Sequence, residues 1–289
     1  MFQIIGIVLL FALVFGSFLM SGGNMAVIIE AAPHEIMCIA GAAVAAFLTS
    51  NSMSVVKATA GGMGKVFKGP KWKASDYRDL LSLLFLLTKT MKSKGVIALE
   101  SHIERPTEST IFSRFPTIMK DHFAVDFICD TLRMMTMNLE DPHQVEDAME
   151  KQLEKHHHEA SAPAIALQST ADGLPALGIV AAVLGVIKTM GSITEPPAVL
   201  GAMIGGALVG TFLGVFLAYG MVGPMATRMK AVIEEEASFY QIIQSVLVAH
   251  LHGNAAQISV EIGRGNVPSE AQPSFLELEE ALGAIPAEA

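Results

Sequence analysis

Two long apolar stretches in the second half of the chain, Ile165 to Met190 and Ala198 to Met221, hold residue types that suit the wall of an ion path. Pro175 in the first stretch can free a backbone carbonyl one turn earlier and permit bending. Thr211 in the second places a hydroxyl inside an apolar segment. Neither stretch has a carboxylate in its central part, since Asp172 lies toward one end. These residues predict a wall whose titratable partner group comes from another element.

Small residues recur at helical spacing along both stretches. They are Pro175, Gly178, Ala182, Gly185 and Thr189 in the first, and Ala202, Gly206, Gly210, Gly214 and Ala218 in the second. Such stripes let helix backbones approach closely in lipid, which gives helices no hydrophobic reason to associate. Packing between the two helices is one interpretation, and a surface for a partner's helix is the other. The Thr211 hydroxyl can likewise serve the ion or simply bond its own backbone.

Other kinds of site find no support in the sequence. It has no Gly-rich phosphate loop with a lysine, no GxSxG and no HExxH, which are common signatures of enzyme sites. His156, His157 and His158 are consecutive and cannot share a helix face, so no metal site is predicted. The formal net charge of -9 comes from interspersed acidic and basic residues, which argues against a nucleic-acid partner. We predict no enzyme activity, no catalytic residue, no metal and no cofactor.

The composition indicates the elements that must position these residues. With 52% hydrophobic and only 16% charged residues, the chain is too apolar for an ordinary soluble protein. About 20 apolar residues cross a bilayer as a helix, and two further stretches, Phe2 to Met20 and Ile36 to Thr49, qualify or nearly qualify. We therefore predict an all-α integral membrane protein with four transmembrane helices, and Pro33 just before the second of them.

This prediction divides the chain into four segments: residues 1–50 as a transmembrane hairpin, 51–164 as a cytoplasmic helical domain, 165–225 as transmembrane helices 3 and 4, and 226–289 as a cytoplasmic C-terminal helix and tail. Helices 3 and 4 are expected to extend far into the cytoplasm.

The distribution of positive charge predicts the orientation. All Lys and Arg residues except Lys188 fall between Lys57 and Lys155 or between Arg228 and Arg264, and none lies in the connections 21–35 and 191–197. Because Lys and Arg concentrate on the cytoplasmic side, we expect both blocks and both termini in the cytoplasm.

Several short motifs in a fixed order indicate a family. They are Phe15-Gly16 with Gly22-Gly23, GVIALE at 95–100, ESTIF at 108–112 with Pro116, DGLPALG at 172–178, VGTFLG at 209–214, LAYG at 217–220 with Pro224, and PSFLELEEA at 273–281. In order and spacing the chain resembles the MotA family, the A subunits of bacterial flagellar stators. That family is related to the sodium-driven PomA proteins and more distantly to ExbB and TolQ.

The resemblance implies partners and a location. Members form a ring, a pentamer around a dimer of MotB-type or PomB-type B subunits that carry the ion-binding aspartate, in the lipid of the bacterial inner membrane. Their cytoplasmic part pushes on the rotor protein FliG. By motif register the functional prolines fall on Pro175 and Pro224, the rotor-facing acid on Glu100 and its basic partner on Lys92. The family usually has Arg at that last position, and Lys keeps the charge without the fork geometry. From the sequence alone, Lys92 and Glu100 can also be ordinary solvated helix residues.

The resemblance also bears on the transported ion. Sodium-driven relatives have Thr where this chain has Ala182, and alanine offers no ligand, so protons are favoured and sodium is the alternative. Thr211 matches a threonine found in both groups. The predicted function is an ion-driven torque generator in which ion passage changes contacts at Pro175, Ala182 and Thr211. A transducer of the ExbB or TolQ kind, serving outer-membrane processes, is the first alternative, and a passive membrane scaffold is the second.

Overall fold

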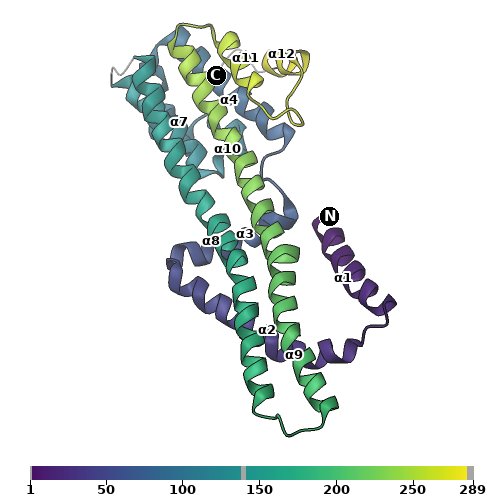
Figure 1. Ribbon diagram of the computed structural model, residues 1–289. Helices are drawn as coiled ribbons and strands as arrows, with labels where there is room; N and C mark the ends of the chain where they lie inside the picture. Colours follow the sequence, from purple (N-terminus) through teal and green to yellow (C-terminus); the bar gives the residue numbers. More distant parts are fainter. Residues whose placement is uncertain (1, 138–140, 285–289) are drawn as a thin grey trace. The chain divides into compact units, whose positions relative to one another are not determined.

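The structure, a computed structural model, describes residues 2–137 and 141–284, and every regular element within these ranges is helical (Figure 1). This confirms the all-α prediction. Among the described residues, four helices are long and apolar enough to cross a membrane, judged by length and composition: Phe2–Met20, Met25–Ser50, Pro142–Met190 and Pro197–Leu251. The chain divides into two compact units, Met1–Gly69 with Ser161–Val232 and Pro70–Ala160 with Ile233–Ala289. The four-segment division drawn from the sequence stays a prediction.

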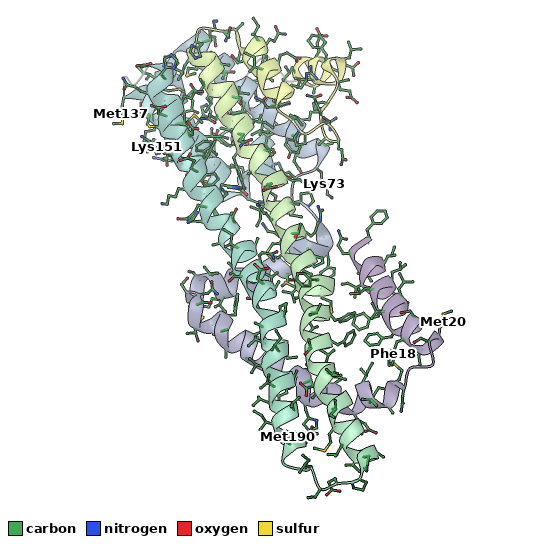
Figure 2. The ribbon with its side chains drawn as sticks, viewed as in Figure 1. Phe18, Met20, Lys73, Met137, Lys151 and Met190 are labelled. Atoms are coloured by element: carbon green, nitrogen blue, oxygen red, sulfur yellow. The ribbon has the colours of Figure 1, made fainter. Side chains whose placement is uncertain are left out.

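The first unit contains the apolar helices. Its elements are α1 (Phe2–Met20), α2 (Met25–Ser50), α3 (Met53–Lys68), α9 (Pro197–Leu217) and a π-helical turn, η4 (Ala218–Val222), together with parts of α8 (Pro142–Met190) and α10 (Gly223–Leu251). Within this unit α8 and α9 lie side by side and are joined by a short turn after Met190 (Figures 1 and 2).

The start of α2 corrects the sequence-based expectation. Pro33 was expected just before this helix, but it lies inside it, because the helix begins at Met25. Asn24 caps the helix, and its side-chain oxygen accepts a hydrogen bond from the Ala26 N–H at 3.0 Å. Alanine, methionine and isoleucine after this cap sustain the helix, and Pro33 removes only one backbone hydrogen bond. Most of the expected connection at 21–35 is therefore helical.

Aromatic side chains hold α1 against α9. Phe11 meets Phe216 edge to face with ring centroids 5.2 Å apart, and Phe15 meets Phe212 in the same way at 5.9 Å. Phe18, near the end of α1 (Figure 2), covers the following turn, since a Cβ on Gly23 would lie 2.5 Å from its ring. Edge-to-face pairs of this kind add about 0.5–1.5 kcal/mol each beyond area burial.

The second unit is built around α4 (Ala74–Lys94), whose buried face forms the centre of its apolar core. Around it pack α7 (His122–Thr136), α11 (Ala256–Gly265), α12 (Phe275–Gly283) and the later part of α10. Between α4 and α7 run five short helices: η1 (Val96–Leu99), α5 (Glu100–Glu104), η2 (Pro106–Glu108), η3 (Phe112–Arg114) and α6 (Pro116–Met119). Gly95 ends α4 with a φ of 83°, a conformation that glycine adopts without steric cost.

A polar junction ties distant segments of this second unit together. Asp121 caps α7 by accepting a hydrogen bond from Ala124 N–H at 2.8 Å. The same carboxylate accepts hydrogen bonds from Lys71 Nζ at 2.6 Å and from Tyr240 Oη at 3.1 Å. Burial alone would raise the pKa of Asp121, but the hydrogen bonds and the Lys71 charge outweigh burial and lower it. The ionised carboxylate is therefore part of the folded state.

Candidate functional site

The small-residue stripes of α8 and α9 face each other within this chain. A Cβ built on Gly178 would lie 2.9 Å from the Gly210 carbonyl oxygen and 3.0 Å from Gly214 Cα. A Cβ on Gly185 would lie 2.6 Å from Ala207 Cβ. Only glycine permits this approach of the two backbones. The first interpretation, packing between the two helices, accounts for these glycines, and a surface for a partner's helix stays a prediction for the rest of the stripes.

Pro175 is half-buried inside α8, at the same contact with α9. Because proline has no N–H, the Ala171 carbonyl one turn earlier has no helical donor at this position. A Cβ on Gly214 would lie 2.7 Å from the Leu174 carbonyl oxygen, so the turn that contains Pro175 presses directly on Gly214. A change in the bend of α8 at Pro175 would therefore move backbone atoms that contact α9.

Pro224 is exposed and is separated from the π-helical turn Ala218–Val222 by Gly223 alone. Within that turn the Gly223 N–H donates to the Ala218 carbonyl, five residues earlier. A proline in a helix cannot donate to the residue four positions back and its ring crowds that carbonyl, and a π turn relieves this conflict. This turn was not expected from the sequence. The Gly223-Pro224 pair in an otherwise helical segment was its only signal.

Ala182 and Thr211 lie at the same level of the two neighbouring helices. A Cβ on Gly210 would lie 3.1 Å from Ala181 Cβ, and these two residues directly precede Thr211 and Ala182. Both side chains are half-buried. Among the described residues the Thr211 hydroxyl makes no hydrogen bond, whereas the Thr189 hydroxyl donates to its own backbone at Gly185 O. The alternative that Thr211 merely bonds its own backbone is not what the structure shows.

The Glu35 carboxylate, which was not expected from the sequence as a site residue, lies at this level. A Cβ on Gly210 would lie only 2.5 Å from Glu35 Oε2, so the Glu35 side chain of α2 occupies the space that glycine leaves on α9. The signal was the spacing of Ile28, Ala31, Glu35 and Ile39, which puts Glu35 on the apolar face of a helix. It was missed because Pro33 was interpreted as the boundary of the helix.

The two predicted rotor-facing residues lie in the second unit but do not pair with each other. Lys92 near the end of α4 is exposed, and its ammonium donates to the carbonyls of Gly253 and Asn254 at 3.4 Å each. Glu100 begins α5 and is exposed at the edge of a surface groove of about 780 Å³. Gly95 and the η1 turn separate them along the chain.

The groove beside Glu100 contains a histidine held in its neutral form. His102 Nδ1 lies 2.7 Å from Ser109 Oγ. Burial, and secondly the charge of Lys94, lower the pKa of His102. At neutral pH the imidazole is therefore uncharged, and the charge of the groove comes from its carboxylates and Arg105.

His156, the first of the three consecutive histidines, packs against aromatic side chains. His156 stacks on Phe123 with ring centroids 3.7 Å apart and meets Tyr240 edge to face. Within residues 2–137 and 141–284 no group of three His, Cys, Asp or Glu side chains is placed to hold a metal ion.

Comparison with known proteins covers almost the whole chain. The family model "Motility protein A N-terminal" matches residues 4–95, and the model "MotA/TolQ/ExbB proton channel family" matches residues 120–242. Motility protein A of Escherichia coli is 39% identical over 285 residues, which is 99% of this chain and 96% of that protein. Chemotaxis protein LafT of Vibrio parahaemolyticus is 33% identical over 97% of this chain and 98% of its own length.

Solved structures show the same fold. The structure of C. jejuni MotAB superposes with a TM-score of 0.72 at 21% sequence identity, covering 94% of this chain and 98% of that one. The flagellar MotAB stator complex from Bacillus subtilis gives 0.72 at 20% identity, covering 96% and 100%. Together with the sequence matches, these findings make the chain a member of the motility protein A (MotA) family of the MotA, TolQ and ExbB proton channels.

Proposed function

We propose that this chain is the A subunit of a flagellar stator, and that ion flux through its complex with a B subunit drives rotation. The observation that carries the proposal is the contact between the Pro175 turn of α8 and Gly214 of α9, beside Thr211. It provides a bendable element, a rigid partner helix and a hydroxyl within one apolar helix bundle. Relatives that are 39% and 33% identical are named a motility protein and a chemotaxis protein.

The proposed arrangement in the membrane has α1, α2, the later part of α8 and α9 as spans. Their length and apolar composition support this assignment. The Lys and Arg distribution supports cytoplasmic termini and a cytoplasmic second unit, in the bacterial inner membrane. The lipid-facing role of these helices is supported by exposed apolar side chains such as Ile179, Val183 and Ile187 on α8.

The proposed partners are a MotB-type or PomB-type B subunit, the rotor protein FliG and further copies of the chain, five around a B dimer. The two solved structures that share this fold are of MotAB complexes. The proposed ion is the proton, with sodium as the alternative, because Ala182 offers no ligand at the level of Thr211. A transducer of the ExbB or TolQ kind is disfavoured, since the Motility protein A N-terminal model matches residues 4–95.

The test is complementation with an ion-flux measurement. The chain, expressed with its B subunit in a motile bacterium that lacks its own A subunit, should restore swimming. Vesicles that hold the complex should take up protons, and vesicles that hold the chain alone should not. A complex that conducts ions but restores no swimming would point to an ExbB-like transducer, and one that conducts nothing would point to a scaffold.

A further inference from the structure

The helices α2 and α9 run parallel along a seam where three glycines of α9 face α2. A Cβ on Gly205 would lie 3.3 Å from Val27, and a Cβ on Gly206 would lie 3.7 Å from Ala31. The next contact along the seam is Glu35 against Gly210. In the first two contacts α2 contributes an apolar side chain, Val27 or Ala31, and in the third it contributes the Glu35 carboxylate.

Glu35 is partly buried and lies beside an apolar cluster. Ala31, Ala32, Cys38 and Ile39 on the same helix belong to one cluster with Leu213 of α9. Ile39, one turn after Glu35, is completely buried. Among the described residues Glu35 has neither a hydrogen-bond partner nor an ion-pair partner.

A structural role does not explain this carboxylate. A carboxylate on an apolar helix face costs free energy unless hydrogen bonds or an opposite charge compensate it, and an alanine or leucine would pack there without that cost. Carboxylates inside membrane helices that face the bundle are, for this reason, typical of ion pathways. Gly210, the residue before Thr211, leaves the space that the carboxylate fills.

We propose that Glu35 is a cation-binding carboxylate of the ion path that this chain itself contributes, holding the transported ion beside the bare backbone of Gly210, at the level of Thr211. From the start of α2 at Met25, Glu35 is about 15 Å along the helix at 1.5 Å per residue. The carboxylate therefore lies between the aqueous end of α2 and the middle of the bundle. This inference rests on the proposed function.

The step is balanced for either ion. For a proton, an O–H bond of a hydronium ion breaks as an O–H bond forms on a Glu35 oxygen, and water leaves. The neutral acid then returns the proton to a water molecule farther along the path and becomes a carboxylate again. For sodium, the carboxylate binds and releases the ion with no change in covalent bonds.

The test measures proton and sodium uptake by proteoliposomes that hold the full chain with its B subunit. Glu35→Gln keeps the shape of the side chain and should lower the flux by at least about tenfold. Glu35→Asp keeps the charge and should conduct more than the Gln variant. Glu195→Gln, in the exposed turn between α8 and α9, is the matched control and should conduct normally.

A second variant keeps the carboxyl group and moves it. Gly210→Ala places a methyl group 2.5 Å from Glu35 Oε2, which must shift. This change alone should lower the flux, and combined with Glu35→Gln it should add little to the loss, because both changes act on the same group.

The outcomes separate this inference from the proposed function. If the unaltered complex conducts neither ion, the proposed function fails. If it conducts and Glu35→Gln conducts equally well, only the role of Glu35 is overturned. A Gln variant that no longer co-purifies with the B subunit, or an Asp variant that conducts no better than Gln, would assign Glu35 to packing and also overturn the inference.

Discussion

Gly178 of α8 and Gly214 of α9 meet backbone to backbone, since a Cβ on Gly178 would lie 3.0 Å from Gly214 Cα. This contact fixes how closely the two helices approach. The Pro175 turn, Thr211 and the Glu35 carboxylate all lie on residues beside it. The distance between these two backbones therefore sets the distances among the side chains of the candidate ion path.

Gly178→Ala should destabilise the helix pair by about 1–3 kcal/mol, because the added methyl group overpacks a backbone contact that cannot yield. Thermal unfolding of the purified protein in detergent measures this. Gly173→Ala is the control on the same helix, since a Cβ there meets nothing within 4 Å. It should be neutral or slightly stabilising, and an equal loss in both variants would contradict the packing argument.

Pro175→Leu should leave assembly with the B subunit intact and abolish swimming. Leucine restores the N–H that pairs with the Ala171 carbonyl, so α8 becomes stiffer at its contact with Gly214. Co-purification measures assembly, and swimming in soft agar measures rotation. Pro175→Ala should behave in the same way, and Pro163→Ala, at the other proline inside α8, should still swim. Normal swimming by the Pro175 variants would remove this proline from the mechanism.

Asp121→Asn should lower the stability of the second unit by about 1–3 kcal/mol, because it removes the charged acceptor of Lys71 Nζ and Tyr240 Oη. The folded state lowers the pKa of Asp121. Its stabilising effect is therefore present above the unfolded-state value of about 3.9 and is lost as the pH falls below it.

The measurement is thermal unfolding as a function of pH. The unaltered chain should lose this part of its stability below about pH 4, whereas the Asn variant should lack that part throughout. Asp126→Asn, at an exposed position on the same helix α7, is the control and should retain the unaltered pH dependence. If the Asp121 variant loses stability in acid as the unaltered chain does, the polar junction contributes nothing to the stability of the second unit.

Glu100→Lys should impair swimming while leaving ion flux intact, because like charges placed together at an interface weaken docking. An opposite charge reversal on the rotor protein should restore part of the motility. Glu270→Lys, at another exposed position of the second unit, should swim normally. If no rotor variant rescues Glu100→Lys selectively, an electrostatic contact at this residue is excluded.

Helix type and approximate extent were predictable because they depend on local composition. The first apolar stretch lies within α1, the third within α8, and the fourth within α9 and the π-helical turn η4. The second failed at its start, where Pro33 was taken for a boundary. A capped helix can absorb one proline when favourable residues precede it, and this error also concealed Glu35.

Contacts between residues far apart in sequence were not predictable from pattern. Tyr240 and Asp121 are separated by 119 positions, and no periodicity links them. The facing of Gly178 and Gly214 was one of two open interpretations, because a stripe of small residues indicates close approach without saying which helix approaches. The π turn before Pro224 depends on how the chain resolves a local clash, so the same residues could have given a kink.

The π turn at Ala218–Val222 makes the length of this segment matter more than its composition. Because each residue advances a helix by about 100°, deleting one residue here would turn every later side chain of α10 by that angle. Met229, whose Sδ and Cε now lie 3.3 Å from a Cβ built on Gly62 of α3, would be carried away from that position. Substitutions in the turn should therefore be tolerated far better than a single deletion.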